Sequence, residues 1–426
     1  MRRILELAIA AMGVQYWQKV KILFGSSLIG YWPLWEASGS VAADISGNNR
    51  NAAYVNSTLS SATSKKGKPC PLFPGSPVGY INLGSDSLYA AADHTQGFIS
   101  AWVKFTATGG YIFRFGNNSS NIFEIRYGGG GLGIDVNYRA GSTFNANTIR
   151  GFWPLNNWIN IIASWSLADN LTSIYINGVL PQSVMTPMAD TYVGNFAYAL
   201  AFAYSGSAGT SITGYGSDVL FGNRKITPAE AWTVAGSQGQ VVFDGDSRSN
   251  LKYAQGLMMT YAFGNTTKQY GYATMGTNGR QLHDLITDAP TKIDPLLKPG
   301  NNVLVLWAGL NDCTGGLRTA AQIYADTQTY CAARKAAGWN KVILCSEVDA
   351  QGTGCSTWHS TTWPALRALT DADHSFVDGY ADLGGDARLQ DATNTAYFAA
   401  DKIHENDVPT NTVYGEVVGP VIASLT

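Results

Sequence analysis

The sequence predicts two folds in one chain, an antiparallel β-sandwich followed by an α/β domain with a parallel sheet. The sandwich is predicted by short alternating segments separated by Gly, Asn and Ser clusters, such as Phe98–Lys104 and Thr172–Gly178. The α/β domain is predicted by apolar runs that lead into polar turns, as where Val241–Phe243 is followed by Asp244–Ser247. At 426 residues the chain is longer than one hydrophobic core usually organises.

Residues 1–26 are expected to form a helix that precedes the domains. Arg2 and Arg3 lead into an apolar stretch typical of a signal peptide, but Glu6 interrupts it and the stretch is too short to span a bilayer. The apolar positions 4, 5, 8, 9, 12 and 16 have helical spacing, which predicts a short amphipathic helix. Such a helix can dock on its own domain, form a homo-oligomer or anchor the chain in a larger particle.

The amino-acid composition indicates which class of molecule the protein is expected to bind. Charged residues make up 14% of the chain and aromatic residues 12%, and the 47 glycines indicate a turn-rich, β-rich protein. The net charge of −2 gives no basis for a nucleic-acid partner or for binding to an anionic membrane surface. Because Trp and Tyr side chains stack on the hydroxylated rings of sugars, a polysaccharide or cell-surface glycan is the expected partner.

Residues 27–235 contain five short sequence motifs that are interpreted together. They are Gly30–Leu34, Asp44–Asn48, Trp158–Ala163, Tyr175–Gly178 and Asn223–Glu230. These motifs resemble those of the laminin-G-like, concanavalin A-like family, and the resemblance implies an all-β jelly-roll sandwich. Members of that family often bind glycans, sometimes with calcium, and others serve only as spacers or assembly surfaces.

Two features of this segment concern a metal ligand set and the core. Asp44 and Asn48 offer oxygen ligands to a calcium ion, or else belong to an Asx turn that needs no metal. Trp32, Trp102 and Trp158 stand in strand-like motifs and are expected in the core.

The boundary between the domains is expected in Ala235–Gln240, a short Gly/Ser/Gln stretch. Just before it, Thr227 is predicted as a helix N-cap, with Pro228 in the first turn and Glu230 closing a capping box. The predicted domains are therefore the N-terminal helix at 1–26, the sandwich at 27–235 and the α/β domain at 238–426.

Three motifs in the α/β domain place a nucleophile, an oxyanion donor and an acid–base pair in order along the chain. Ser247 follows an apolar strand, and a strand end is where open α/β folds present reactive groups. His404 can take the proton of Ser247, and Asp401 can reach the other ring nitrogen if both lie on one turn. Each motif alone also fits an ordinary turn or helix cap, so the prediction depends on their combination.

Two further residues are suited to stabilising an oxyanion. Asn311 lies in Ala308–Asp312 after an apolar run, and its side-chain amide donates without carrying charge. Gly279 lies in Gly276–Arg280, and a missing Cβ lets a substrate approach its backbone N–H. With the backbone N–H of Ser247 they would supply donors worth about 3 kcal/mol each in the transition state.

These motifs resemble the SGNH (GDSL-type) hydrolase family over residues 238–426. The residues that match the family's markers are Ser247, Gly279, Asn311 and His404, with Asp401 completing the triad. The resemblance implies a three-layer α/β/α fold with a parallel sheet, and a serine esterase that requires no metal or cofactor. One stretch departs from the family's pattern, namely Glu405–Pro409 after the histidine.

The resemblance also implies a substrate class and a biological context. Family members with carbohydrate-type modules resemble carbohydrate deacetylases, so an O-acetylated polysaccharide is the expected substrate. A lipid or aryl esterase and a non-catalytic structural or receptor-binding protein are the alternatives. A laminin-G-like segment after a short helix is similar to phage tail and virion-surface proteins. We therefore expect the virion surface and other virion proteins as the context, with secretion as the alternative.

The remaining polar residues receive structural interpretations. The histidines His94, His283, His359 and His374 are expected on the surface or in packing roles, and Arg280 as a solvated side chain. Ser346–Gly352 follows a strand-like run and is expected on the rim of the active site. The five cysteines, Cys70, Cys313, Cys331, Cys345 and Cys355, allow two disulfides and one free thiol, or buried reduced thiols.

Overall fold

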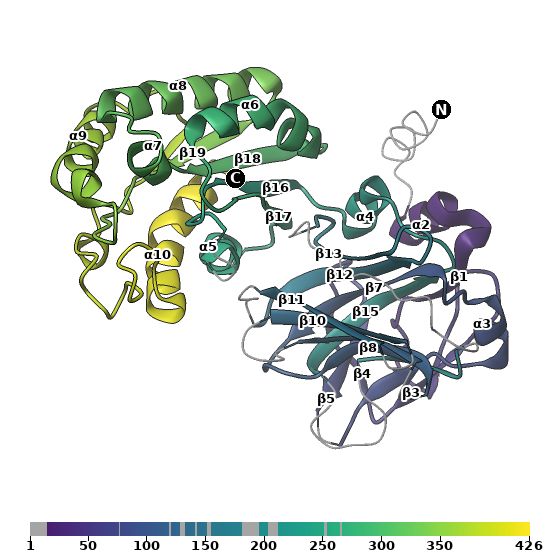
Figure 1. Ribbon diagram of the computed structural model, residues 1–426. Coiled ribbons are helices and arrows are strands. Elements are labelled where there is room, and N and C mark those ends of the chain that lie inside the picture. Colours follow the sequence, from purple (N-terminus) through teal and green to yellow (C-terminus); the bar gives the residue numbers. More distant parts are fainter. Residues whose placement is uncertain are drawn as a thin grey trace. The chain divides into compact units, whose positions relative to one another are not determined.

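The computed structural model describes residues 15–75, 77–118, 121–127, 133–140, 143–150, 155–180, 196–202, 212–250, 254–264 and 266–426. The amphipathic helix predicted from positions 4–16 lies almost wholly outside these residues. Within them, the chain divides into two compact units, one formed by residues up to Gly236 and the other from Ser237 to Thr426 (Figure 1).

The first unit contains two antiparallel sheets, which confirms the prediction of a β-sandwich. For the residues that the structure places, the first sheet has seven strands in the order β13-β12-β7-β15-β5-β4, and β1 also pairs with β15. The bounds are β1 (Leu28–Trp32), β4 (Thr58–Thr63), β5 (Pro69–Pro74), β7 (Gln96–Phe105), β12 (Trp158–Ser166), β13 (Leu171–Ile176) and β15 (Thr213–Gly222).

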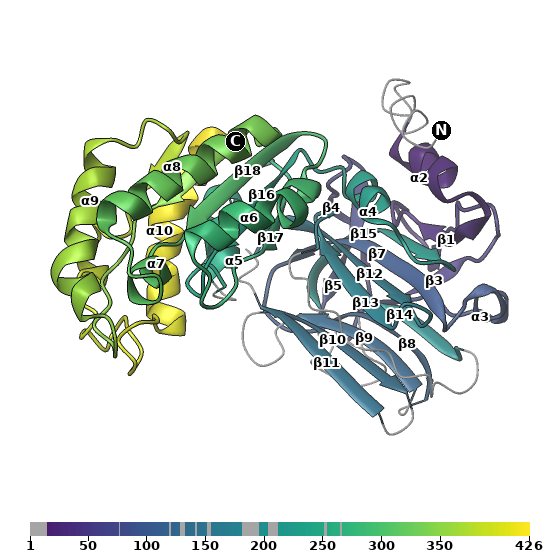
Figure 2. The ribbon, with the colours of Figure 1, turned by 45° about the horizontal axis from the view of Figure 1, so that its top comes forward.

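The second sheet forms the other layer of this unit (Figure 2). Its eight strands, counted over the described part of the chain, follow the order β11-β10-β9-β8-β14-β6-β3-β2. The bounds are β2 (Val41–Ala42), β3 (Ala52–Val55), β6 (Tyr80–Asn82), β8 (Tyr111–Asn118), β9 (Asn121–Tyr127), β10 (Gly133–Ala140), β11 (Thr143–Arg150) and β14 (Tyr198–Ala201).

Aromatic side chains fill the space between the two sheets. The ring of Phe115 in β8 lies 5.0 Å from that of Trp165 in β12 and 5.7 Å from that of Phe221 in β15. Successive side chains of a strand point to opposite faces, so Phe113 joins Phe115 on the inward face. These cross-sheet contacts bury the large apolar surface that holds a sandwich together.

The three tryptophans that were predicted in the core behave differently. Trp32 and Trp102 are fully buried, as expected. Trp158 is only partly buried, because it is the first residue of β12 and lies at the end of the strand. The alternating pattern of a strand predicts to which face of the sheet each side chain points, but it does not predict how well the ends of the strand are covered.

Short helices complete the first unit, and one of them is capped as predicted. They are α2 (Tyr16–Phe24), followed by the 3₁₀ turn η1 (Gly25–Ser27), then α3 (Asp86–Ala91) and α4 (Pro228–Ala235). The hydroxyl of Thr227 accepts the backbone N–H of Glu230 at 3.3 Å, and the Glu230 carboxylate accepts the backbone N–H of Thr227 at 2.9 Å. This reciprocal pair confirms the predicted capping box.

The second unit is built on a parallel five-stranded sheet, counted over its described residues, which confirms the predicted α/β class. The strand order is β17-β16-β18-β19-β20. The bounds are β16 (Gly239–Gly245), β17 (Tyr270–Thr274), β18 (Asn301–Trp307), β19 (Lys341–Cys345) and β20 (Gly379–Ala381). In β16 every residue is buried, as expected for a central strand covered on both faces.

Helices cover both faces of this sheet, and Figure 1 shows α6 and α8 on one face and α5 and α10 on the other. The bounds are α5 (Ala254–Phe263), α6 (Leu282–Lys292), α7 (Leu310–Thr314), α8 (Ala320–Ala337), α9 (Trp363–Ala372) and α10 (Asp407–Leu425), with short turns η2 (Asp294–Leu296), η3 (Trp358–Thr362) and η4 (Ala387–Leu389). The chain leaves β16 for β17 on one side and then crosses to β18 on the other. Such a reversal of strand order opens a crevice at the carboxyl ends of β16 and β18, where open α/β folds bind ligands.

Two further properties follow from the described residues. All five cysteines are free and buried, so the structure takes the alternative of reduced thiols. In the part of the chain that the structure covers, none of the helices combines the length and the apolarity needed to cross a lipid bilayer.

Candidate active site

Ser247 lies in a turn directly after β16, at the carboxyl edge of the parallel sheet. The backbone N–H of Asp246 donates to the carbonyl oxygen of Trp307 at 3.3 Å, and the Ser249 hydroxyl donates to the same oxygen at 3.0 Å. Gly245 permits this close approach, because a Cβ there would stand 1.9 Å from that oxygen. The turn around Ser247, called the serine turn below, is therefore hydrogen-bonded to the end of the neighbouring strand β18.

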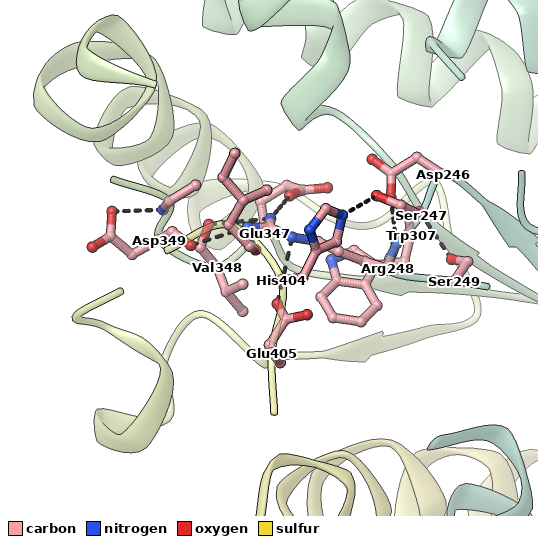
Figure 3. Close-up of polar contacts among 12 residues, drawn as sticks. Asp246, Ser247, Arg248, Ser249, Trp307, Glu347, Val348, Asp349, His404 and Glu405 are labelled. Carbon is pink, nitrogen blue, oxygen red and sulfur yellow. Dashed lines mark hydrogen bonds and ion pairs between the residues drawn. The ribbon is translucent and has the colours of Figure 1, made fainter. Parts of the chain in front are cut away.

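The three residues predicted as a triad form a hydrogen-bonded chain. Ser247 Oγ lies 3.0 Å from His404 Nε2, although the two residues are 157 positions apart in the sequence (Figure 3). His404 Nδ1 lies 2.7 Å from Asp401 Oδ2. The structure thus brings the hydroxyl, the imidazole and the carboxylate together in the order that proton transfer from the serine requires.

The turn that carries His404 also orients Asp401. The other carboxylate oxygen of Asp401 accepts the backbone N–H groups of Ile403 at 2.9 Å and His404 at 3.0 Å. Partial burial raises the pKa of Asp401, but the hydrogen bonds from the His404 ring and from these two N–H groups outweigh it and lower the pKa. The carboxylate is therefore ionised at neutral pH and can hold the histidine in one tautomer.

Asn311 stands in the first turn of α7, just after β18. Its side-chain Nδ2 donates to Asp246 Oδ2 at 3.1 Å, which holds the amide beside the residue that precedes Ser247. An amide nitrogen carries two N–H groups, so a second one is left to donate to a bound group. Asn311 is not the N-cap of α7, a position that Gly309 occupies.

Gly279 lies in the turn between β17 and α6. Its φ of +75° is in the left-handed region that favours glycine, and the space where a Cβ would stand is open. Thr277 N–H donates to Gly245 O at 3.0 Å and Asn250 Nδ2 to Asn278 Oδ1 at 3.1 Å, which hold this turn against the serine turn. Among the described residues the backbone N–H of Gly279 has no acceptor, so it stays open to an incoming group.

Sequence reasoning missed a cluster of buried charges beside the serine. Arg248, Asp246, Glu347 and Glu405 are each at most 6% exposed. Burial raises the pKa of all three carboxyl groups, that of Glu347 to about 8, while the Arg248 guanidinium lowers them in part. An arginine directly after Ser247, at the end of a buried strand, was the available signal, but only the fold shows which carboxyl groups it contacts.

The cluster also accounts for the stretch that departs from the SGNH-type pattern after His404. Glu405, its first residue, is buried and lies with its Oε1 3.4 Å from Arg248 Nε. Phe398 and Glu405 form an isolated antiparallel bridge, and Ala399 N–H donates to His404 O at 2.8 Å. The departure therefore leaves the contact between His404 and Ser247 intact.

His283, His374 and Arg280 have partners that do not belong to this hydrogen-bonded chain. His283 is exposed beside Asp284, and the ring of His374 stacks on that of Tyr380 at 4.4 Å. Arg280 is paired with Asp288 at 2.5 Å rather than solvated.

His359 is exposed, as predicted, and also contacts a buried carboxylate. Its Nδ1 lies 2.7 Å from Oδ1 of Asp349, whose side chain is fully buried. Asp349 belongs to the predicted rim segment, and its carbonyl oxygen accepts a hydrogen bond from Arg248 at 3.0 Å. The rim segment therefore does lie beside the serine turn.

A cavity of about 410 Å³ opens beside α7, between the start of α8 and the η3–α9 segment. Its lining includes Cys313, Thr357 and Thr361, together with Arg318, whose guanidinium is ion-paired with Asp326. The volume lies within the range of about 300–1,000 Å³ that is usual for small-molecule sites. The second unit therefore has room for a ligand near the segment that carries Asn311.

Asp44, one of the two calcium ligands considered for the sandwich, is engaged in a turn. Asp44 accepts backbone N–H groups from Tyr31 at 3.0 Å, Ser46 at 2.8 Å and Arg50 at 2.9 Å, and the Ser46 hydroxyl at 2.9 Å. This is the Asx-turn arrangement. Over the residues described, no group of three or more His, Cys, Asp or Glu side chains is placed to hold a metal ion.

Comparison with known proteins concerns mainly the first unit. Residues 75–232 match the model of the concanavalin A-like lectin/glucanases superfamily. No curated protein sequence matches this chain. Among solved structures, the chain is similar to domain 4 of an extracellular arabinanase from Geobacillus stearothermophilus, with 16% identity and a TM-score of 0.39, covering 49% of this chain and 98% of that one.

Two other similar structures are matched over only part of their length. They are the Trypanosoma rangeli sialidase, with 15% identity and a TM-score of 0.38, and the binding domain of botulinum neurotoxin serotype D, with 14% identity and a TM-score of 0.40. The matches cover 55% and 51% of this chain, and only 39% and 52% of those chains. The family match covers residues 75–232 and no other part of the chain.

Proposed function

We propose that the second unit is a serine esterase of the SGNH type. The observation that carries the proposal is the chain from Ser247 Oγ through His404 to Asp401, with distances of 3.0 and 2.7 Å. It stands at the carboxyl edge of the sheet, where the strand order reverses between β16 and β18. Asn311 and Gly279 bring polar donors to the same edge.

In the proposed reaction His404 takes the proton of Ser247 as the hydroxyl attacks the ester carbonyl, and then gives it to the leaving alcohol. Asp401 stabilises the imidazolium that forms between these steps. The negative charge on the former carbonyl oxygen is met by the backbone N–H groups of Ser247 and Gly279 and by the amide of Asn311. A water activated by His404 then releases the acyl group and restores the serine.

The substrate that we propose is an O-acetylated polysaccharide. The support is the concanavalin A-like segment at 75–232, whose superfamily is described as containing lectins and glucanases. A sandwich that holds the polymer would raise the local concentration of ester groups at Ser247. We further propose the virion surface as the setting, with secretion as the alternative; both belong to the resemblance rather than to the geometry of the site.

The first prediction concerns the nucleophile. Ser247→Ala should lower the kcat for 4-nitrophenyl acetate by at least about a thousandfold, because the remaining donors and binding contacts cannot replace a covalent intermediate. The measurement is steady-state hydrolysis by both proteins, with circular dichroism and melting temperature to establish that the variant is folded.

A matched variant and three substrates separate the proposal from its rivals. His374→Ala removes a histidine of the same unit whose contacts are the Tyr380 ring and the carbonyl oxygen of Thr370, and it should keep wild-type activity. Acetate release from an O-acetylated polysaccharide supports the deacetylase, whereas preference for 4-nitrophenyl decanoate would favour a lipid esterase. Equal background rates for wild type and Ser247→Ala on all three substrates would favour a non-catalytic role.

A further inference from the structure

The residue after the nucleophile, Arg248, is unusual because its charged side chain is fully buried. The whole residue is 1% exposed and its side chain 0%. Removing a guanidinium from water is costly unless charged partners and hydrogen bonds replace the water. Since Arg248 adjoins Ser247, the groups that replace water around it also determine where the serine turn can lie.

The partners of Arg248 come from two segments that are distant in the sequence (Figure 3). From the segment after β19, Nη1 donates to Glu347 Oε2 at 2.8 Å and Nη2 donates to Asp349 O at 3.0 Å. From the histidine segment, Nη2 donates to Ile403 O at 3.2 Å and Nε pairs with Glu405 Oε1 at 3.4 Å. One guanidinium therefore joins the serine turn, the rim segment and the histidine segment.

The two contacts to the histidine segment lie on either side of the base. Ile403 immediately precedes His404 and Glu405 immediately follows it. Arg248 therefore contacts the backbone of the residue before the imidazole and the side chain of the residue after it, while its own backbone is joined directly to Ser247. The planar fork of an arginine can hold several acceptors in fixed directions, which the ammonium of a lysine cannot do.

We propose that Arg248 is a positioning residue, which sets the distance between Ser247 Oγ and His404 Nε2 by joining the two segments that carry them. The proposal rests on the proposed esterase function. It extends that function to a residue that does not touch the reacting atoms. A buried charge cluster is weak evidence for stability alone, because well-packed apolar residues often stabilise a core equally well. The place of the cluster beside Ser247 is explained if the cluster fixes the position of Ser247 relative to His404.

The test needs variants that remain folded. Arg248→Met alone leaves the buried acidic side chains without their arginine partner, so Arg248→Met/Glu405→Gln replaces one of those acidic groups as well. Arg248→Lys keeps the positive charge and loses the fork, and it provides a second folded variant. The matched control is Arg334→Met: Arg334 is also nearly fully buried, pairs with Asp294 at 2.5 Å, and lies on the side of the sheet where β18 and β19 begin.

Two readouts are measured on each folded full-length protein at pH 6.5. One is the kcat and KM for 4-nitrophenyl acetate, with Ser247→Ala as the blank. The other is amide hydrogen exchange of residues 401–406, which reports local opening whether or not the protein is an esterase. A misplacement of about 1 Å between reacting groups can lower a rate by about a hundredfold.

We expect the double variant to lose at least about tenfold in kcat, with KM within about twofold and faster exchange at 401–406. Arg248→Lys should recover part of both effects, and Arg334→Met should show neither. Unchanged exchange at 401–406, or an unchanged kcat in a folded variant, overturns the proposal. If wild type and Ser247→Ala are equally inactive, the esterase function fails, and the exchange data still decide whether Arg248 joins the segments.

Discussion

At the residue scale, hydrogen bonds from neighbouring groups hold the side chains of the candidate site in place. Asp401 is held by three hydrogen bonds within its own turn, and Asn311 is held by Asp246. These contacts are made between groups of the protein itself, so the groups are ordered when the protein folds. Preorganised groups of this kind are what oxyanion stabilisation requires.

The second prediction concerns the amide donor. Asn311→Ala should lower kcat for 4-nitrophenyl acetate by about a hundredfold with little change in KM, because one donor is lost only where charge develops. Steady-state kinetics at several ester concentrations measures both constants.

The control for this prediction is another asparagine of the same sheet. Asn340 Oδ1 accepts the backbone N–H of Asn302 at 2.8 Å where β18 begins, so Asn340→Ala should lower stability and leave kcat unchanged. An Asn311→Ala protein with wild-type kcat would remove Asn311 from the oxyanion site.

The third prediction concerns pH and the buried Glu347. Its folded pKa of about 8 lies above the ordinary value of 4.5, so the folded state binds the proton more tightly than the unfolded chain. The stability that Glu347 contributes is therefore fully present below pH 4.5 and is lost as the pH rises through about 8. Urea unfolding at pH 5 and pH 8 should show this loss in wild type and a much smaller one in Glu347→Gln.

Asp246 and Glu405 share this environment, and burial raises the pKa of both, so part of the pH dependence should remain in Glu347→Gln. Glu416→Gln changes an exposed glutamate that pairs with Arg388 and should behave as wild type. A Glu347→Gln protein with the full wild-type pH dependence would show that another group titrates.

At the element scale, the parallel register of β16 and β18 brings the site together. The strands run side by side from Gly239 and Asn301 to Gly245 and Trp307. Their carboxyl ends therefore finish at the same level, and the turns that carry Ser247 and Asn311 begin there.

The fourth prediction tests this approach of the two strand ends. Gly245→Ala should destabilise the second unit by about 3 kcal/mol or more and abolish hydrolysis, because the added Cβ would collide with the backbone of β18. Thermal unfolding and hydrolysis of 4-nitrophenyl acetate measure the two effects. Gly354→Ala is the control: Gly354 also has a positive φ, of +86°, but open space around it, so its cost should be near 1 kcal/mol.

The elements differ in how far the sequence predicts them. The capping box of α4 is visible as a local pattern, because the Thr227 and Glu230 contacts lie within one helical turn. The half-burial of Trp158 is not visible, because it depends on what covers the end of β12. Local hydrogen bonds can be predicted from a few neighbouring residues, whereas burial depends on distant ones.

At the scale of the whole molecule, the chain divides into two compact units, and the boundary along the sequence lies between Gly236 and Ser237. Each has its own sheet system and its own buried core, with an aromatic core in the sandwich and an apolar parallel sheet in the second unit. Units of this kind can fold separately when few contacts cross the boundary.

The fifth prediction uses that division. A protein comprising residues 237–426 should hydrolyse 4-nitrophenyl acetate with a kcat within about threefold of the full chain. On an acetylated polysaccharide it should be about tenfold or more slower at low polymer concentration, because the proposed glycan contact of the sandwich is lost. Acetate release from both proteins measures this difference, and equal rates on the polymer would contradict the proposed role of the sandwich.

The sequence by itself determined the two fold classes and the capping box of α4, and it supplied the residues that we propose as a triad, because each depends on local pattern or on recognisable motifs in order along the chain. The tertiary structure alone decided that Ser247 meets His404 across 157 positions, that Asn311 is held by Asp246, and that Arg248 binds the residues on both sides of His404. The physical reason is that periodicity and turn chemistry act over a few residues. Contacts between distant segments are set by the crossovers that bring the carboxyl ends of the strands to one edge, and no local pattern records which side chains meet there.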